Sequence, residues 1–331
     1  MGVERQEGEL VVEGRLVCTN EACQYEYPII DGIPILLPNA RQFISDNALA
    51  ILQRDDLSET IEGMLGDCCG PDSALDRIRQ HASCYGWSHY AHRDPHEGPE
   101  AASHSLDALL DQILARSGPV AGPVLDAGCA VGGGTFSLAT RTNDLCLGVD
   151  VHFALLRVAA AAARRGIVQY PRRRTGIIYD RRVVELGDPS RQFIDFWASD
   201  ATALPLGSGF FSTVIGLHTR DSVASPVALL TELTRVLAPG GKLILACPYD
   251  WTGAVTPVQS WIGGHSARGQ HGGDSDRILI DLLTPGAHPA SQNELRIIHE
   301  SDDLIWKVRW HQRATIDYRI HLVVADKPLA A

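Results

Sequence analysis

The sequence predicts an α/β protein, built on a mostly parallel sheet with helices on both faces. From about residue 122 onward, short apolar runs typical of buried strands alternate with helical patterns, and this alternation indicates strand–helix–strand units. A glycine-rich turn joins the first of these strands to its helix. Two strand-like runs close the chain, at 306–313 and 316–325, and they predict a final antiparallel hairpin.

Each element of this sheet follows from its residue pattern. The apolar run at 124–126 ends on an acid, and so does the one at 145–150. The alanine-rich segment 153–164 favours a helix, because alanine has the highest helix propensity. A helix at 227–237 ends before Pro239-Gly240-Gly241, which does not continue it. We therefore expect strands at 124–126, 145–150, 211–217 and 243–247, and helices at 135–140, 153–164 and 227–237.

The chain divides into three predicted segments. Residues 1–40 form a small β-unit, with Asp31-Gly32 as a tight turn between apolar runs. Residues 41–118 form a helical capping segment, in which leucines at helical spacing predict one helix at 105–116. The main α/β domain follows at 119–331. Two insertions interrupt its rhythm, at about 164–194 and 250–300.

Composition restricts the functional classes. The 331 residues are 45% hydrophobic and 21% charged, which is typical of a globular protein. A net charge of −11 disfavours a nucleic-acid binder. The N-terminus is polar and acidic, without the apolar run of a secretory signal, and no long uncharged apolar stretch predicts a membrane span. The eight cysteines are irregularly spaced, so we expect reduced thiols and a cytoplasmic protein. Nothing in the sequence sets the oligomeric state.

The most informative segment is the glycine-rich turn that begins at Asp126. It has the spacing D-x-G-x-A-x-G and differs from the G-x-G-x-x-G pattern that places a pyrophosphate on a helix N-terminus. An acid leading into the turn suits a ligand that bears an ammonium group and no phosphate. Asp150, at the end of the second strand, suits hydrogen bonds to two ribose hydroxyls. Asp200 supplies a further acid just after the third strand.

With these landmarks in this order, residues 120–250 resemble the class I S-adenosylmethionine-dependent methyltransferases. The resemblance implies a Rossmann-like, seven-stranded sheet, S-adenosylmethionine as cofactor and S-adenosylhomocysteine as product. Ala130 stands where a glycine is common in that family. The implied cofactor positions are Asp126, Gly128, Cys129, Ala130 and Gly132 around the methionine portion, Asp150 and Val151 at the ribose and adenine, Asp200 and Ala201 at the adenine, and Leu217 and His218 near the transferable methyl.

Residues 16–38 resemble the small zinc-ribbon-like Trm112-like domain, through Cys18, Cys23 and the run Tyr-Pro-Ile-Ile-Asp-Gly-Ile-Pro. A structural zinc site takes four ligands, usually two cysteine pairs. This sequence offers one pair, with four residues between, so we predict a degenerate unit without metal. The alternative is a metal completed by a distant histidine or by a second subunit.

Five histidines between 81 and 104 raise a second metal hypothesis, because imidazole is the commonest metal ligand. Asp94-Pro95 interrupts their helical spacing and argues against it. We interpret this stretch as a cap over the cofactor, with Tyr85 and Trp87 closing the cleft on the substrate side.

The two insertions carry different residues. Eight arginines lie between Arg164 and Arg191, and Thr175-Gly176 predicts a hairpin turn among them. They either pair with the carboxylates of this acidic chain or bind an anionic substrate, an RNA backbone or an acidic partner. The second insertion follows the fifth strand. Tyr249 and Trp251 make it a candidate for the acceptor pocket.

We predict an enzyme that transfers a methyl group from S-adenosylmethionine, with a small molecule as the preferred acceptor. RNA methylation is the first alternative, and a non-catalytic partner protein with this fold is the second. His218 ends the fourth strand at the edge where ligands bind in open α/β sheets. It is therefore our candidate general base, with packing against the cofactor as the alternative and His152 as a weaker rival.

Overall fold

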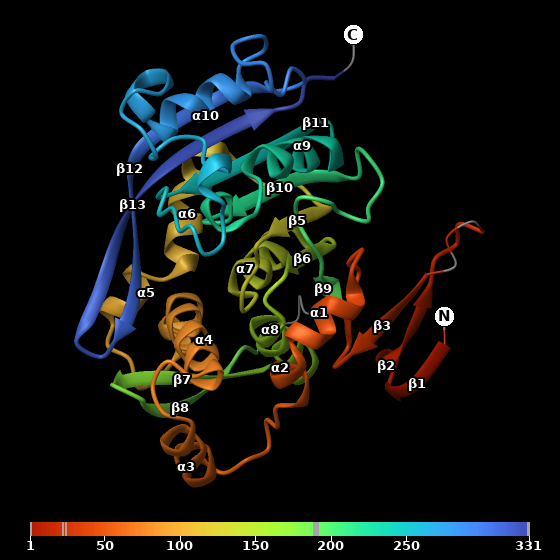
Figure 1. The fold of residues 1–331 in the computed structure, drawn as a ribbon, viewed down its shortest axis with the longest axis vertical. Helices are drawn as coiled ribbons and strands as arrows, with labels where there is room; N and C mark the ends of the chain where they lie inside the picture. The colour runs from red at the N-terminus through yellow and green to blue at the C-terminus, as the bar shows by residue number, and fades with distance from the viewer. Residues whose placement is uncertain (1, 22, 24, 188–191, 330–331) are drawn as a thin grey trace.

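A seven-stranded sheet forms the centre of the molecule (Figure 1). The computed structural model describes residues 2–329 except 22, 24 and 188–191. The strand order is β12-β13-β11-β10-β5-β6-β9. The five strands from β11 to β9 in this order run parallel, whereas β13 is antiparallel to both β11 and β12. The predicted parallel sheet with its closing hairpin is confirmed.

The strands of this sheet match the apolar runs of the sequence, with two differences. A strand was expected at 243–247, but β11 begins at Leu237 and so includes Pro239-Gly240-Gly241. The final hairpin was expected to begin at residue 306, but β12 begins at Arg296 and so includes the end of the predicted second insertion. The strands are β5 (Val124–Ala127), β6 (Cys146–Asp150), β9 (Ile194–Ala198), β10 (Phe211–Leu217), β11 (Leu237–Cys247), β12 (Arg296–His311) and β13 (Ala314–Asp326).

Helices cover both faces of the sheet, because alternate residues of each strand point to opposite sides. On β10, Val214 packs with the leucines of two helices, α9 (Pro226–Val236) and α10 (Ser275–Leu283). Its neighbour Ile215 packs on the other face, with α6 (Leu106–Ser117) and α7 (Gly133–Thr142). Farther along this second face, α8 (Phe153–Arg165) buries phenylalanine, leucine and alanine side chains.

The N-terminal segment forms a separate antiparallel sheet of β1 (Gly2–Glu7), β2 (Leu10–Val17), β3 (Glu26–Ile30) and β4 (Ile33–Pro34). It joins the edge of the main sheet just after β4. The backbone N–H of Leu36 donates to the carbonyl of Ala198 at 2.9 Å, and Ile35 forms a parallel bridge with Ala198.

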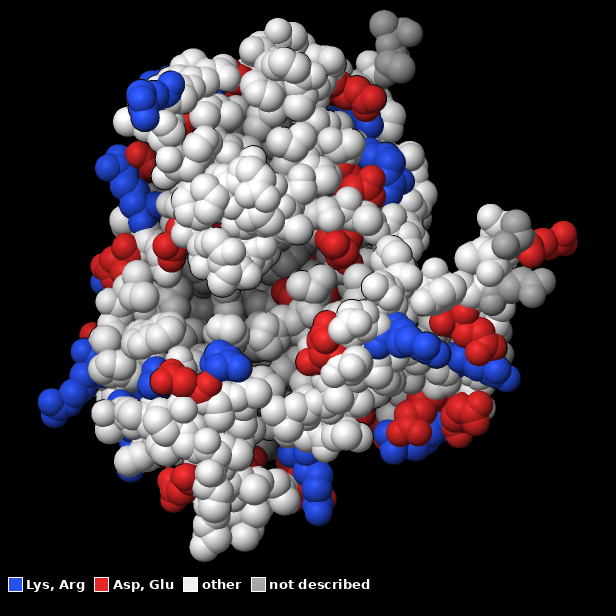
Figure 2. Space-filling model, in the orientation of Figure 1, with Lys and Arg blue, Asp and Glu red and all other residues white. Residues whose placement is uncertain are grey.

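The capping segment consists of several helices. They are α1 (Ala40–Asp46), α2 (Ala48–Leu52), α3 (Glu59–Cys69), α4 (Ala74–Tyr90), the short helix η1 (Ala91–Arg93), α5 (Glu100–Ser103) and α6. The first insertion forms a hairpin of β7 (Ile167–Thr175) and β8 (Ile178–Glu185), and α4 lies beside it (Figure 1). The space-filling view shows a hollow near the centre of this face, between the parts that carry α10 and α4 (Figure 2).

Candidate active site

The glycine-rich turn after β5 takes three left-handed backbone conformations, with φ of +83° at Gly128, +49° at Ala130 and +83° at Gly132. A Cβ at Gly128 would lie 2.2 Å from Oγ1 of Thr219, and one at Gly132 would lie 2.6 Å from the ring of Phe196. Glycine is therefore required at both positions by conformation and by packing. Ala130 takes a left-handed conformation at a cost of about 1–2 kcal/mol, and such strain is often kept at functional sites.

Gly128→Ala is expected to lower the free energy of unfolding by about 2 kcal/mol or more, because strain at positive φ and overpacking against Thr219 add together. Gly176→Ala is the matched control: Gly176 has φ of +55° in the hairpin turn, and an added Cβ would have nothing within 4 Å. Urea unfolding of both variants separates the two contributions. Equal losses would show that the contact with Thr219 relaxes freely.

Two acids hold the turn in place. The carboxylate of Asp126 is buried and accepts a hydrogen bond of 2.7 Å from the Thr135 hydroxyl, and burial raises its pKa to about 6. The carboxylate of Asp150, which ends β6, accepts from the backbone N–H of Ala130 at 2.9 Å and from that of His152 at 2.7 Å. Asp150 thus contacts the turn directly, as a residue shared between the turn and a bound ribose would.

The predicted adenine side lies at the ends of β6 and β9. Val151 is 49% exposed beside Asp150, which leaves an apolar surface open. One oxygen of Asp200 accepts from the backbone N–H and the hydroxyl of Thr202, at 2.8 and 2.7 Å. Ala201 is buried, and the buried hydroxyl of Ser199 has no hydrogen-bond partner within the described part of the chain.

Helix α4 lies directly on the glycine-rich turn. Nδ1 of His89 accepts from the first backbone N–H of α7, at Gly133, over 3.0 Å, and the Tyr90 hydroxyl donates to the carbonyl of Val131 over 2.6 Å. Burial lowers the pKa of His89 to about 3, so its imidazole is neutral and able to accept. These contacts support the interpretation of this stretch as a cap.

The two aromatic side chains predicted to close the cleft have different surroundings. Tyr85 is partly buried, and its raised pKa reflects burial first and then nearby acids, including Asp150 and Asp221. Its hydroxyl therefore lies near the carboxyl edge of the sheet. Trp87 is 4% exposed and lies under the guanidinium of Arg309 on β12, at 4.4 Å from its ring centroid. This contact favours a structural role for Trp87.

His218 follows Leu217 at the end of β10, with φ of +55°. The centroids of its ring and the Trp306 ring are 3.9 Å apart in an edge-on contact. Its buried Nε2 has no hydrogen-bond partner among the described residues. Burial lowers the pKa of His218 to about 3, so the imidazole is neutral at working pH but a weak base. The ring contact with Trp306 is the one expected of the packing alternative, and the role of His218 as general base stays a prediction. His152, the weaker rival, contacts His81 of α4 at 3.1 Å.

His218→Phe is expected to keep kcat within about tenfold of wild type, because phenylalanine preserves the ring contact with Trp306, whereas loss of a general base lowers kcat by about 10²-fold or more. Because the lowered pKa keeps His218 neutral above about pH 4, the variant should also leave the pH profile between 5 and 8 unchanged. Steady-state kinetics over this range test both points. If the variant instead lost most of its kcat and the acidic limb of the pH profile, His218 would be the general base.

Tyr249 and Trp251 follow β11 at the same edge. The Tyr249 hydroxyl shares a 2.6 Å hydrogen bond with Nδ1 of His321 on β13. Nε1 of Trp251 donates to Ser275 Oγ over 3.1 Å, and its ring stacks on Trp261 with centroids 5.7 Å apart. The structure thus gathers the second insertion beside the ends of β10 and β11.

Sequence reasoning missed Arg220, two residues beyond His218. Its side chain is only 2% exposed, and its guanidinium lies 5.1 Å from the Tyr249 ring centroid. An arginine just past a strand end gives no local sign of burial. The signal that was available is its position in the loop after the fourth strand, at the ligand-binding edge.

No group of three or more metal-ligating side chains gathers within the described ranges 2–21, 23, 25–187 and 192–329. Cys18 is partly buried and Cys23 is exposed, both with free thiols. The described helices also include none that is long and apolar enough to cross a membrane.

Four of the five arginines of the hairpin are paired with carboxylates of the same chain. The buried pairs are Arg172–Glu97 at 2.9 Å and Arg182–Asp94 at 3.4 Å. Arg181 pairs with Glu62 at 2.8 Å and Arg174 with Asp180 at 3.5 Å. These contacts agree with the interpretation that the hairpin neutralises acids of its own chain. Figure 2 shows basic and acidic side chains interspersed on this face.

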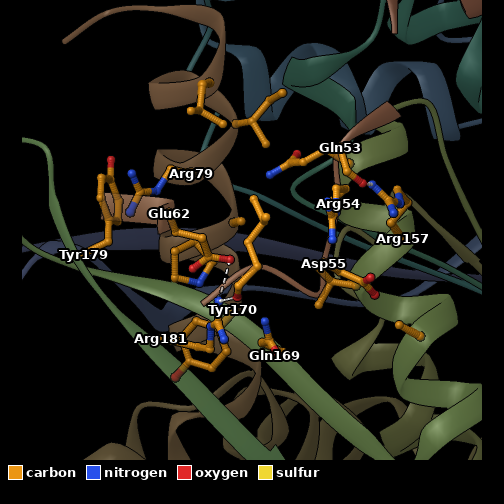
Figure 3. A pocket seen from close by; sticks show the side chains of 18 of the residues that line it. Gln53, Arg54, Asp55, Glu62, Arg79, Arg157, Gln169, Tyr170, Tyr179 and Arg181 are labelled. Carbon is orange, nitrogen blue, oxygen red and sulfur yellow. Dashed lines mark hydrogen bonds and ion pairs between the residues drawn. The ribbon is translucent and has the colours of Figure 1, made fainter. Parts of the chain in front are cut away.

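A cavity of about 800 Å³ lies outside this site, between α3, α4, α8 and the hairpin (Figure 3). Apolar side chains such as Leu65, Ile78 and Val158 line it together with charged groups. Its arginines already have partners: Arg157 pairs with Asp31 at 2.8 Å, and Arg79 lies 4.2 Å from the ring centroid of Tyr179. The predicted cofactor residues do not line it.

The site at the carboxyl edge can now be compared with known proteins. Residues 125–245 match the family described as "Methyltransferase domain". This segment is similar to methyltransferase domains. A demethylmenaquinone methyltransferase of Renibacterium salmoninarum is 41% identical over 64 residues, 19% of this chain and 27% of that protein. A ubiquinone biosynthesis O-methyltransferase of Xanthomonas oryzae pv. oryzae is 29% identical over 152 residues, 45% of this chain and 53% of that protein.

The chain therefore spans between about a quarter and about half of the length of these curated relatives. Among solved structures, a SAM-dependent methyltransferase from Methanosarcina mazei is 18% identical with a TM-score of 0.40, covering 64% of this chain and 94% of that one. Haemonchus contortus phosphoethanolamine N-methyltransferase 2 in complex with S-adenosyl-L-methionine is 22% identical with a TM-score of 0.33, covering 43% of this chain and 28% of that one.

The residues of the matched segment, 125–245, fit S-adenosylmethionine. Buried Asp126 and the carboxylate of Asp150 give the turn the acidic character that an ammonium group and ribose hydroxyls require. The exposed side chain of Val151 offers an apolar surface for a ring. The unpartnered buried hydroxyl of Ser199 provides a further polar group beside Asp200.

Proposed function

We propose that this chain is an enzyme that transfers a methyl group from S-adenosylmethionine to a small-molecule acceptor. The observation that carries the proposal is the carboxyl edge of the sheet. There the turn after β5 lies under the cap formed by α4, with Asp150 at the end of β6 and Asp200 just after β9. In open α/β sheets this edge binds the ligand.

When bound, the cofactor supplies a methyl group already activated on a sulfonium, and S-adenosylhomocysteine is the product. The chain's contribution is therefore alignment and exclusion of water. Asp126 and Asp150 orient the turn, and α4 covers it through His89 and Tyr90. A hydroxyl acceptor loses its proton as the new bond to carbon forms. A base is needed only where that proton is still bound at working pH.

A small-molecule acceptor is supported by the acidic balance of the chain and by the aromatic side chains around the site, Trp306 and Tyr249 among them. The two relatives named above bear names of quinone-pathway methyltransferases. RNA methylation has less support, because Arg172, Arg181 and Arg182 are engaged with acids of this chain.

The Trm112-like character of the N-terminal unit and the cytoplasmic location remain hypotheses. In the proposed arrangement the β1–β4 unit acts as a support for the sheet edge, because the Leu36–Ala198 hydrogen bond fixes it next to Ser199 and Asp200. That position is compatible with a unit that needs no metal of its own.

Calorimetry with S-adenosylhomocysteine is the first test, and we expect one binding site per chain. Transfer of a labelled methyl group is then followed separately into the small-molecule and RNA fractions of a cell extract. Label in the small-molecule fraction supports the proposal. Label in RNA would contradict it and support the first alternative, RNA methylation. A folded protein that does not bind S-adenosylhomocysteine would contradict the cofactor assignment and favour a non-catalytic partner protein.

A further inference from the structure

Arg220 is a buried cation without an oxygen or nitrogen acceptor in the described part of the chain. It lies in η3 (Arg220–Ser222), just after β10, and its side chain is 2% exposed. None of its three guanidinium nitrogens has a hydrogen-bond partner among the residues that the structure describes. An arginine side chain stays charged and carries five N–H donors. Burying it without partners costs several kcal/mol, so a protein keeps such a group only for a reason.

The adjacent acid, Asp221, attracts this cation but lies too far from it for a close ion pair among the described residues. Asp221 is 3% exposed, but its Oδ2 accepts a 2.7 Å hydrogen bond from the backbone N–H of Asp250 and forms no ion pair with Arg220. Burial raises the pKa of Asp221 above its usual value, which further weakens it as a counter-charge. The other close neighbours are the Tyr249 ring, the His321 imidazole on β13 and the Cys247 thiol, whose sulfur is at best a weak acceptor.

One aromatic ring lies against the guanidinium of Arg220, and other aromatic side chains lie beside that ring and beside His218. Tyr249, with φ of +59°, presents its ring to the guanidinium and lies 6.5 Å from Trp251. His218, two residues before, lies against Trp306. A cation among aromatic walls is complementary to a flat ring that bears a carboxylate, because charge-assisted hydrogen bonds are strong where water is excluded.

Arg220 also lies on the acceptor side of the cofactor residues. The preceding residue, Thr219, donates to the Ala127 carbonyl over 2.6 Å and so contacts the turn. The contacts of Arg220 itself, Tyr249 and Cys247, belong to β11 and the loop after it. Asp150 ends β6, which is two strands away in the opposite direction. An anion held here would sit beside the cofactor's methionine end without belonging to its ribose site.

We propose that Arg220 binds the carboxylate of the methyl acceptor, and that this acceptor is an aromatic acid. The inference rests on the proposed function for the existence of an acceptor. The methionine carboxylate of the cofactor shares the same chemistry and is the competing source of the anion, so the test separates the two.

The experiment compares two probes by calorimetry in the presence of saturating S-adenosylhomocysteine. They are 3,4-dihydroxybenzoate and catechol, which differ only in the carboxylate. We expect the wild type to bind the acid at least about tenfold more tightly than catechol, and Arg220→Met to abolish this preference. Arg319→Met is the matched control, because the side chain of Arg319 is 71% exposed on β13, and it should retain the preference.

Two further measurements keep the assignment falsifiable. The melting temperature of ligand-free Arg220→Met should equal or exceed that of the wild type, because the variant removes an unpartnered buried charge. Its affinity for S-adenosylhomocysteine should not change. A lower affinity for S-adenosylhomocysteine would assign Arg220 to the cofactor's carboxylate, and a lower melting temperature with an intact acid preference would make it structural. Both results overturn the proposal.

Equal affinity of the wild type for the two probes, or binding of neither, also overturns the proposal. Binding of S-adenosylhomocysteine by the wild type is measured first and tests the proposed function separately. The two hypotheses can therefore fail independently.

Discussion

Glu97→Gln is expected to lower the free energy of unfolding by about 3–5 kcal/mol, because it removes the charge shared by two largely buried guanidinium groups. The Glu97 side chain is 5% exposed, with one oxygen 2.9 Å from Arg172 of the hairpin and the other 2.9 Å from Arg309 of β12. Glutamine keeps the shape but leaves both cations without this counter-charge. Equilibrium unfolding in urea measures the loss.

Glu294→Gln is the matched control for this variant. Glu294 pairs with Lys327 at 2.6 Å but is 64% exposed, so its loss should cost about 1 kcal/mol or less. Similar losses for the two variants would mean that water screens the Glu97 cluster. They would also contradict the idea that the ion pairs of Glu97 hold the hairpin and β12 against the segment that follows α4.

The ion pairs of Glu97 and Asp94 also affect function, through α4. Glu97 and Asp94 follow α4 and η1, and their arginine partners come from β7, β8 and β12. Because α4 places His89 and Tyr90 on the glycine-rich turn, loss of these ion pairs should weaken cofactor binding as well as stability. The arginine-rich insertion is thereby connected to the site through its ion pairs.

The sheet could be predicted from the sequence because its signals are local. Buried parallel strands read as short apolar runs, and the acids at Asp126 and Asp150 mark their carboxyl ends. An element without such a local signal could not be predicted in the same way. The start of β12 at Arg296 was missed, because its first half, at the edge of the sheet, is mostly polar and lacks an apolar run.

The contacts that assemble the site are long-range, and no spacing in the sequence encodes them. His89 meets Gly133 across 44 residues, and Glu97 meets Arg309 across 212. A histidine or glutamate in a polar stretch reads as a solvated side chain, yet here both are buried by elements from other parts of the chain. Arg220 escaped notice for the same reason: its burial depends on Tyr249 and β13 packing around it.

Asp150→Ala is expected to weaken binding of S-adenosylhomocysteine by at least about tenfold. Charge-assisted hydrogen bonds to ribose hydroxyls contribute roughly 1.5–3 kcal/mol each, and 1.4 kcal/mol corresponds to a factor of ten. The structure adds a second reason. The same carboxylate accepts from the backbone N–H groups of Ala130 and His152, so its removal also releases the turn that surrounds the methionine portion.

Asp144→Ala provides the matched control, because Asp144 precedes the same strand at its opposite, amino end. There its carboxylate accepts from the neighbouring N–H of Leu145, at 2.7 Å, and is exposed. Calorimetry on both variants, after circular dichroism has shown that they are folded, separates a loss specific to the carboxyl edge from a general loss of an acid. If Asp150→Ala bound S-adenosylhomocysteine as tightly as Asp144→Ala, the ribose assignment would be wrong, and the interactions of Asp150 with the turn would be purely structural.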